Sequence, residues 1–254
     1  MAVVVHTQAD GIAVLSLNRP EALNAISGQT VRELNAALDR IETDETSGLV
    51  LTGMGRAFCA GADLKEAGLR PEERVAEMHE LVLRLAGFPK ISVAAINGLA
   101  LGGGLELAMA CTLRVAATDV PMGLPEAKRL GLFPAYGGTQ LLPRLVGEAK
   151  ALELILTGEP VDSREALRIG LINRVADDCV KAAIDLARAA TVATPAAVSI
   201  IRRLVAQGDG TPLAEGLARE AAAVTQVLRT VEVPPFASKS ARPETTANPG
   251  GEAR

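Results

Sequence analysis

The sequence has few of the residues on which nucleic-acid recognition depends. Its 254 residues include no Trp, one Tyr and four Phe, and 26 Lys and Arg are outnumbered by 30 Asp and Glu. Aromatic rings that stack on bases are therefore scarce, and there is no basic excess to neutralise phosphates. We expect no nucleic-acid partner.

Cysteine and histidine are also scarce. The three cysteines, Cys59, Cys111 and Cys179, are far apart and form no CxxC pair, so we expect buried free thiols rather than disulfides or a zinc site. His6 falls in an N-terminal strand and His79 in a helical stretch, and neither is expected to be catalytic. Acid-base chemistry is left to carboxylates, and we expect no metal or redox cofactor.

Long hydrophobic runs are missing as well. No apolar run approaches the roughly 20 residues that span a bilayer, and the start MAVVVHTQADG lacks a basic segment followed by an apolar one. We therefore expect a cytoplasmic protein with no membrane partner. With 48% apolar residues, the chain is long enough to bury a sizeable core without disulfides or metal.

Apolar runs and turn signals predict an α/β chain of ββα units, repeated about three times before a helical region. A turn at Asp10-Gly11 predicts a hairpin, and Ser27 is a candidate helix cap. The glycine-rich segment 55–66 is predicted to contain no strand, and to open into a helix near Asp63. The other expected strands lie at 48–53, 91–97 and 112–117. Helices are expected at 71–86 and 103–111, and the region 138–229 is expected to be mainly helical.

The familiar glycine motifs of dinucleotide-binding proteins, ATP-binding proteins and serine hydrolases are absent. Phe58 stands where the dinucleotide fingerprint that begins at Gly53 needs its third glycine, and neither GxxxxGK[ST] nor GxSxG occurs. The run Gly102-Gly103-Gly104 comes directly before a helix, where free N–H groups can hold an oxyanion. Close packing of the helix on a strand is the alternative explanation of these glycines.

Two glutamates are candidate acid-base groups. Glu106 lies three residues after Gly103 on a helix that is otherwise Leu, Ala and Met, where a carboxylate loses hydration and its pKa rises. Glu126 follows Pro125 and precedes a loop rich in Gly and Pro; it is also explained as a first-turn acid favoured by the helix dipole. Together they suit the addition or removal of water, or proton transfer beside a carbonyl.

Five segments carry a specific resemblance. They are NRPEALNAIS (18–27), FCAGADLKE (58–66), INGLALGGGLELAMAC (96–111), GLPEAKRLGLFPAYGGTQ (123–140) and LILTGEPVDSREALRIGLINRV (154–175). In this order they resemble the crotonase, or enoyl-CoA hydratase/isomerase, superfamily over residues 2 to about 229. The resemblance implies a spiral of ββα units with a helical C-terminal region.

The resemblance also implies a site for acyl-CoA, in which coenzyme A belongs to the substrate. The peptide N–H groups of Ala62 and Gly103 would polarise the thioester carbonyl. The remaining implied positions are Ala22, Leu23 and Ala25 along the CoA nucleotide; Ala60, Asp63, Leu64 and Lys65 beside the thioester and pantetheine; and Ala135 and Tyr136 in the water-holding loop.

Hydratases of the family have glutamates at the positions of Glu106 and Glu126, whereas isomerases are expected to need only the second. The resemblance therefore favours an enoyl-CoA hydratase in acyl-CoA degradation, which adds water to a 2-trans-enoyl-CoA and forms a 3-hydroxyacyl-CoA. A Δ3-Δ2 enoyl-CoA isomerase, or another enolate-forming enzyme of the superfamily, is the alternative. A noncatalytic or RNA-binding member would be a different class.

The chain departs from the family pattern in places. Tyr136 adds a large ring near the acyl chain, and Thr112 and Leu141 replace frequent Asp and Arg residues. The aperiodic tail 231–254 is expected to be disordered and lacks the helix that usually covers CoA in the family. The absence of this helix either weakens CoA binding or reflects a frame change in the gene.

We expect a core over residues 1–190 that holds the acyl-CoA site. A helical region over 191–230 would serve trimerisation and CoA cover. The assembly implied by the resemblance is a homotrimer or a dimer of trimers.

Overall fold

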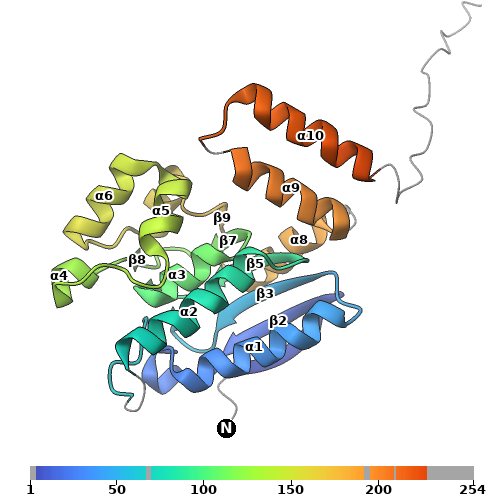
Figure 1. The fold of residues 1–254 in the computed structure, drawn as a ribbon. Helices are drawn as coiled ribbons and strands as arrows, with labels where there is room; N and C mark the ends of the chain where they lie inside the picture. Colours follow the sequence, from blue (N-terminus) through green and yellow to red (C-terminus); the bar gives the residue numbers. More distant parts are fainter. Residues whose placement is uncertain (1–3, 67–69, 192–194, 209, 228–254) are drawn as a thin grey trace, which may run out of the picture.

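The structure, a computed structural model, describes residues 4–66, 70–191, 195–208 and 210–227 (Figure 1). The chain begins with an antiparallel hairpin of β1 (Val4–Ala9) and β2 (Ile12–Leu17), as predicted. Asp10 and Gly11 at its turn have φ values of 52° and 76°, the left-handed conformation that two-residue hairpin turns require. The expected tail at 231–254 lies outside the described residues.

Helix α1 (Gly28–Thr43) follows the hairpin. The Ser27 side chain caps it by accepting a hydrogen bond from the Thr30 N–H, which confirms the predicted cap. Between β2 and α1 lies a short 3₁₀ helix, η1 (Pro20–Ala22).

The larger sheet has the strand order β1-β2-β3-β5-β7-β9 in the described part of the chain. From β2 onward the neighbouring strands are parallel. The later strands of this sheet are β3 (Gly48–Gly53), β5 (Ile91–Ile96), β7 (Leu113–Ala116) and β9 (Arg174–Val175). The first three of these were predicted, whereas β9 was not.

Both faces of this sheet are covered, which explains its nearly continuous apolar strands. Val14, Val50 and Val93 pack on one face with helix α8 (Cys179–Ala190). Their chain neighbours Leu15 and Leu51 point to the opposite face, toward α1 and α2 (Pro71–Ala86). The alternation of side chains along a strand thus divides one sheet between two cores.

A second, smaller sheet has three parallel strands in the order β4-β6-β8. They are β4 (Ala57–Cys59), β6 (Leu99–Leu101) and β8 (Met122–Gly123). The prediction that segment 55–66 contains no strand was therefore wrong. Each strand has only two or three residues, too few to show a period in the sequence, and neighbouring strands supply the hydrogen bonds that hold them.

The small sheet also corrects the number of ββα units. Strands β5 and β6 precede helix α3 (Gly103–Ala110), and β7 and β8 precede helix α4 (Glu126–Leu130), so there are four units over residues 4–130 rather than three.

The helix predicted near Asp63 is wrong for the described residues. The Asp63 N–H donates to the Ile26 carbonyl and its carboxylate pairs with Arg19, so this residue is tied to the segment before α1. The first helix after it in the described chain is α2.

The second half is mainly helical, as predicted, and breaks at Gly158 and Gly170. Its remaining helices are α5 (Gly138–Val146), α6 (Glu148–Thr157), α7 (Ser163–Arg168), α9 (Pro195–Gly208) and α10 (Leu213–Val227). Helix α10 packs along α9, at the end of the molecule away from α1 (Figure 1). The three cysteines are free and buried, which confirms the expectation for them.

Candidate active site

Three chain segments meet where the strands of the small sheet end. β4, β6 and β8 are parallel neighbours, so their carboxyl ends lie at the same edge. The chain leaves β4 toward Ala62, β6 toward Gly103 and β8 toward Glu126. The topology therefore brings together three of the residues predicted from separate motifs.

A cavity of about 460 Å³ opens at this edge. Eight of the predicted residues line it: Ala60, Ala62, Leu64, Gly103, Glu106, Glu126, Ala135 and Tyr136. Apolar side chains that the sequence analysis did not single out complete the wall, among them Val75, Leu101, Leu130, Leu132 and Phe133. The arrangement is that of a mostly apolar pocket with a few converging polar groups.

Two peptide N–H groups are left free at the cavity. Ile26 donates to the Gly61 carbonyl and accepts from the Asp63 N–H, so the Ala62 N–H between them points away from Ile26. Gly103 is the first residue of α3, where N–H groups have no partner within the helix. Within the described residues neither N–H donates to a main-chain carbonyl.

Glycine is required beside this pair of donors. Gly102 has φ 52° and ψ −129°, and a Cβ on it would lie 2.5 Å from Oε1 of Glu126. A Cβ on Gly61 would lie 3.4 Å from the Gly103 nitrogen, which shows how closely the two turns approach. The glycines therefore allow the two turns and a carboxylate to share one small volume.

Glu106 lies inside α3 with 1% of its surface exposed. Its Oε1 accepts hydrogen bonds from the N–H groups of Tyr136 and Gly138, at 2.8 and 2.7 Å. Burial raises the pKa of Glu106 to about 7, with repulsion from Glu126 adding to the rise and the two N–H groups opposing it. A carboxyl group with this pKa can accept a proton at neutral pH.

Glu126 is the first residue of α4, so the first-turn position foreseen from the sequence is correct. Its Oε2 is buried and has no hydrogen-bond partner in the described structure. Burial raises the pKa of this carboxyl. An orphaned buried oxygen costs free energy, so attraction to the helix dipole does not by itself explain the residue.

Tyr136 packs against the turn that carries Gly103. A Cβ on Gly103 would lie 2.7 Å from Cδ2 of the Tyr136 ring, so the ring covers this glycine directly. The side chain is buried and lines the cavity. The large ring noted in the sequence therefore occupies space beside the Gly103 N–H.

The positions expected to contact CoA divide between two regions. Ala22, Asp63 and Lys65 line a separate cavity of about 440 Å³ and do not line the central one. Leu23 and Ala25 line neither cavity and use their carbonyls: Leu23 accepts from the Ala60 N–H and Ala25 from the Arg19 side chain.

Two charged residues of the site were missed from the sequence. Arg19 pairs with Asp63 at 2.9 Å and lines the second cavity. Arg74, on α2, donates to the carbonyls of Asp63 and Glu66, and it pairs with the Glu66 carboxylate at 3.3 Å. Arg19 stands inside a quoted motif, but Arg74 gives no signal in the sequence because its partners lie in another segment.

Comparison with known proteins agrees with this geometry. A family model described as enoyl-CoA hydratase/isomerase matches residues 7–235. YngF of Bacillus subtilis (strain 168), which carries an enoyl-CoA hydratase/isomerase name, is 42% identical over 90% of this chain and 91% of its own. The human mitochondrial methylglutaconyl-CoA hydratase is 38% identical over 87% of this chain and 68% of its own.

Among solved structures, an enoyl-CoA hydratase from Bacillus anthracis superposes with a TM-score of 0.84 at 37% identity, covering 90% of this chain and 92% of the other. The fold is thus the crotonase fold, a class whose members act on acyl-CoA substrates. This chain belongs to the enoyl-CoA hydratase/isomerase family.

Two further findings concern the described residues alone. None of their helices combines the length and apolar character needed to cross a membrane. They also contain no group of three or more His, Cys, Asp or Glu side chains placed to hold a metal ion.

Proposed function

We propose that the chain is an enoyl-CoA hydratase that adds water across the double bond of a 2-trans-enoyl-CoA. One observation carries the proposal: the carboxylates of Glu106 and Glu126 line the same cavity as the free N–H groups of Ala62 and Gly103. Two carboxyl groups provide a base and an acid, and the N–H groups provide an oxyanion site.

In the proposed reaction the water oxygen bonds to C3 while a water proton passes to the Glu106 carboxylate. The electron pair of the C2=C3 double bond forms a C1=C2 bond, and the carbonyl π pair moves to the thioester oxygen, which gives an enolate held by the N–H groups of Ala62 and Gly103. Each such donor is worth roughly 3 kcal/mol in the transition state. Glu126 then gives a proton to C2, and 3-hydroxyacyl-CoA is released. Exchange with solvent returns both carboxyl groups to their starting states.

Burial raises the pKa of both groups, and the division into base and acid comes from the family resemblance. Because burial raises the pKa of Glu106 to about 7, its carboxylate is a competent base near neutral pH. Burial also raises the pKa of the Glu126 carboxyl.

Hydration of crotonyl-CoA, followed as loss of the enoyl-thioester absorbance, tests the proposal. We expect Glu106→Gln and Glu126→Gln each to lower kcat by roughly 100- to 10,000-fold, because each removes a proton-transfer group. Glu45→Gln is the matched control, since Glu45 is exposed on the surface after α1 and lines neither cavity. A Glu106→Gln protein with the full hydratase rate would refute the division of roles.

The alternatives are separate outcomes of the same assays. An isomerase would convert a 3-enoyl-CoA, leave crotonyl-CoA unhydrated and keep its rate in Glu106→Gln. A chain with neither activity that retains RNA in a filter-binding test would be a noncatalytic RNA-binding member.

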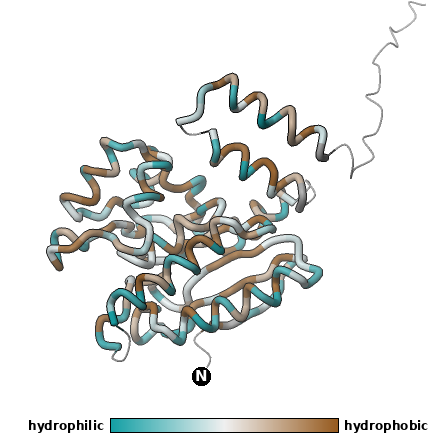
Figure 2. Tube along the Cα trace, viewed as in Figure 1, coloured by the Kyte–Doolittle hydropathy of each residue, from teal (hydrophilic) through white to brown (hydrophobic). Residues whose placement is uncertain are grey.

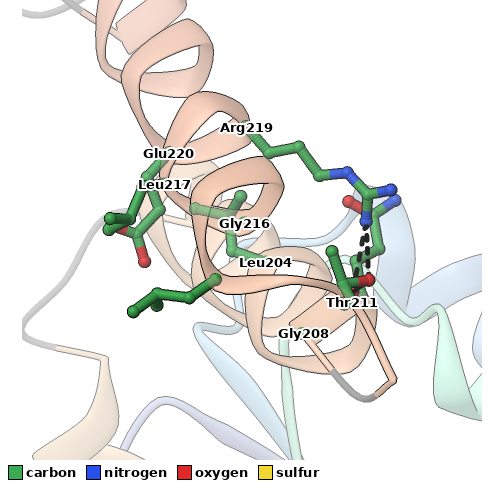
Figure 3. Close-up of a pocket in the computed structure, with 9 residues that line it drawn as sticks. Leu204, Gly208, Thr211, Gly216, Leu217, Arg219 and Glu220 are labelled. Carbon is green, nitrogen blue, oxygen red and sulfur yellow. Dashed lines mark hydrogen bonds between the residues drawn. The ribbon is translucent and has the colours of Figure 1, made fainter.

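We also infer an assembly built from trimers. Figure 2 shows hydrophobic residues along α9 and α10. The exposed apolar side chains of these helices are Ile201, Val205, Leu213, Leu217 and Val224. The cavity between these two helices is small, about 150 Å³. The Arg219 guanidinium, which lines it, donates a hydrogen bond to the Thr211 hydroxyl (Figure 3). Light scattering after size-exclusion chromatography should give the mass of three or six chains; a monomer would contradict the inference.

A further inference from the structure

His79 reaches the loop that holds Glu106. It lies on the exposed side of α2, and its Nε2 is 2.7 Å from the Ala135 carbonyl oxygen. A carbonyl oxygen only accepts hydrogen bonds, so Nε2 carries the proton and donates it. The interaction joins α2 to a loop 56 residues further along the chain.

The bond from His79 ends on a peptide group that also contacts the proposed base. The Ala135 carbonyl and the Tyr136 N–H belong to the same peptide unit. That N–H donates to Oε1 of Glu106 at 2.8 Å. A continuous chain of hydrogen bonds therefore runs from the imidazole, through one peptide, to the carboxylate.

Residues 135–137 form a turn, and Ala135 packs against the core. In the described structure no main-chain N–H donates to the Ala135 carbonyl. The Tyr136 ring packs on Gly103, and the next N–H that reaches Glu106 comes from Gly138, at the start of α5. The hydrogen bond from His79 therefore acts on the carbonyl side of the Ala135–Tyr136 peptide, opposite the N–H that donates to Glu106.

We propose that His79 is a positioning residue, which orients the Ala135–Tyr136 peptide so that its N–H holds the Glu106 carboxylate. The importance of this role for turnover rests on the proposed function of Glu106 as the base. Donation to the carbonyl polarises the peptide and strengthens its N–H as a donor, since linked hydrogen bonds reinforce one another. Loss of the imidazole leaves the carboxylate with one firmly held donor instead of two.

The charged groups near Glu106 stay in place when His79 is changed. Glu126, on α4, repels the Glu106 carboxylate. The Tyr136 phenol belongs to the loop itself and interacts with Arg74 of α2 and with Glu66. None of these side chains is removed in the test, so a change in Glu106 reports on the peptide.

The test compares His79→Ala with His79→Gln. The glutamine amide nitrogen can donate to the same carbonyl, whereas alanine cannot. Carbon-13 NMR of the glutamate side-chain carboxyls gives the pKa of Glu106 directly in the full chain, with Glu106→Gln identifying its signal. We expect His79→Ala to raise this pKa by about 0.5 to 1 unit, the equivalent of one ordinary hydrogen bond.

Kinetics supply the second measurement. We expect His79→Ala to lower kcat for crotonyl-CoA by about 2- to 10-fold and to leave KM nearly unchanged, because the substrate contacts remain. The acidic limb of its pH profile should move to higher pH. His79→Gln should behave as the wild type, and so should Glu72→Gln, a change at an exposed position on the same helix.

The two proposals fail in different ways. If the wild type does not hydrate crotonyl-CoA, the proposed function fails, but the NMR titration still tests the role of His79. If the pKa of Glu106 is the same in His79→Ala and the wild type, the positioning role is overturned. It is also overturned if His79→Gln reproduces the shift seen in His79→Ala.

Discussion

The two sheets of this molecule differ in what surrounds their strands. The larger sheet is covered on both faces, by α8 on one side and by α1 and α2 on the other, and its strands contribute mostly aliphatic side chains to two cores. The three short strands of the smaller sheet end at a cavity, where they place Ala62, Gly103 and Glu126 together. One sheet provides the burial that stabilises the fold, and the other orients the groups that are proposed to take part in the reaction.

This difference predicts that a small change at the edge of the small sheet abolishes turnover. In Gly102→Ala the new Cβ meets Glu126 and the residue must keep a positive φ, which displaces both the carboxylate and the Gly103 N–H. We expect kcat for crotonyl-CoA to fall by about 1000-fold or more.

Gly11→Ala is the control for this change. Gly11 also has a positive φ, of 76°, but lies in the β1–β2 turn with open space around its Cβ position. It should cost some stability and leave kcat intact. Equal losses of kcat in the two variants would show that backbone strain, and not the site, is responsible.

A cavity created by mutation in the core beside the large sheet should have the opposite effect: it should lower stability and leave turnover intact. Leu51 on β3 is 1% exposed, and Leu51→Ala removes buried methyl groups without touching the cavity lining. We expect the free energy of unfolding to fall by about 2 to 5 kcal/mol, measured by urea denaturation, with kcat close to that of the wild type at low temperature. Leu83→Ala, at a position 72% exposed, should change stability little. A large loss of kcat in Leu51→Ala at a temperature where it is folded would contradict the separation.

The site should also be a source of instability that depends on pH. The folded-state pKa of Glu106 is about 7 against 4.5 for a free carboxyl, so its ionisation above pH 4.5 opposes folding, and the cost is complete above pH 7. Gln stays neutral and still accepts the two N–H bonds. We expect Glu106→Gln to stabilise the fold by at most about 3 kcal/mol at pH 8, and by much less at pH 5. Urea denaturation at both pH values measures this, and a gain that does not change with pH would contradict it.

The same contrast explains what the sequence could predict. β2, β3, β5 and β7 are apolar runs bounded by turn signals, so they were predictable. β4, β6 and β8 have two or three residues each, and only their pairing with one another defines them. The fourth ββα unit was missed for this reason.

The candidate site was predictable where a residue contrasts with its neighbours. Glu106 is conspicuous among Leu, Ala and Met, and the glycines around 103 mark a close approach of the backbone. Arg74 and His79 are ordinary residues of an amphipathic helix until folding brings them to the 63–66 segment and to Ala135. Family resemblance supplied the roles proposed for the glutamates, and the structure supplied their environment.

The most direct test of the account measures kcat for crotonyl-CoA in Glu106→Gln, Glu126→Gln and the double variant. Because the account makes the two carboxyl groups act on one substrate in successive steps of one reaction, the double variant should be about as slow as the slower single variant, as expected of groups that work as a unit. Losses that multiply in the double variant, or a single variant with the wild-type rate, would contradict a shared site.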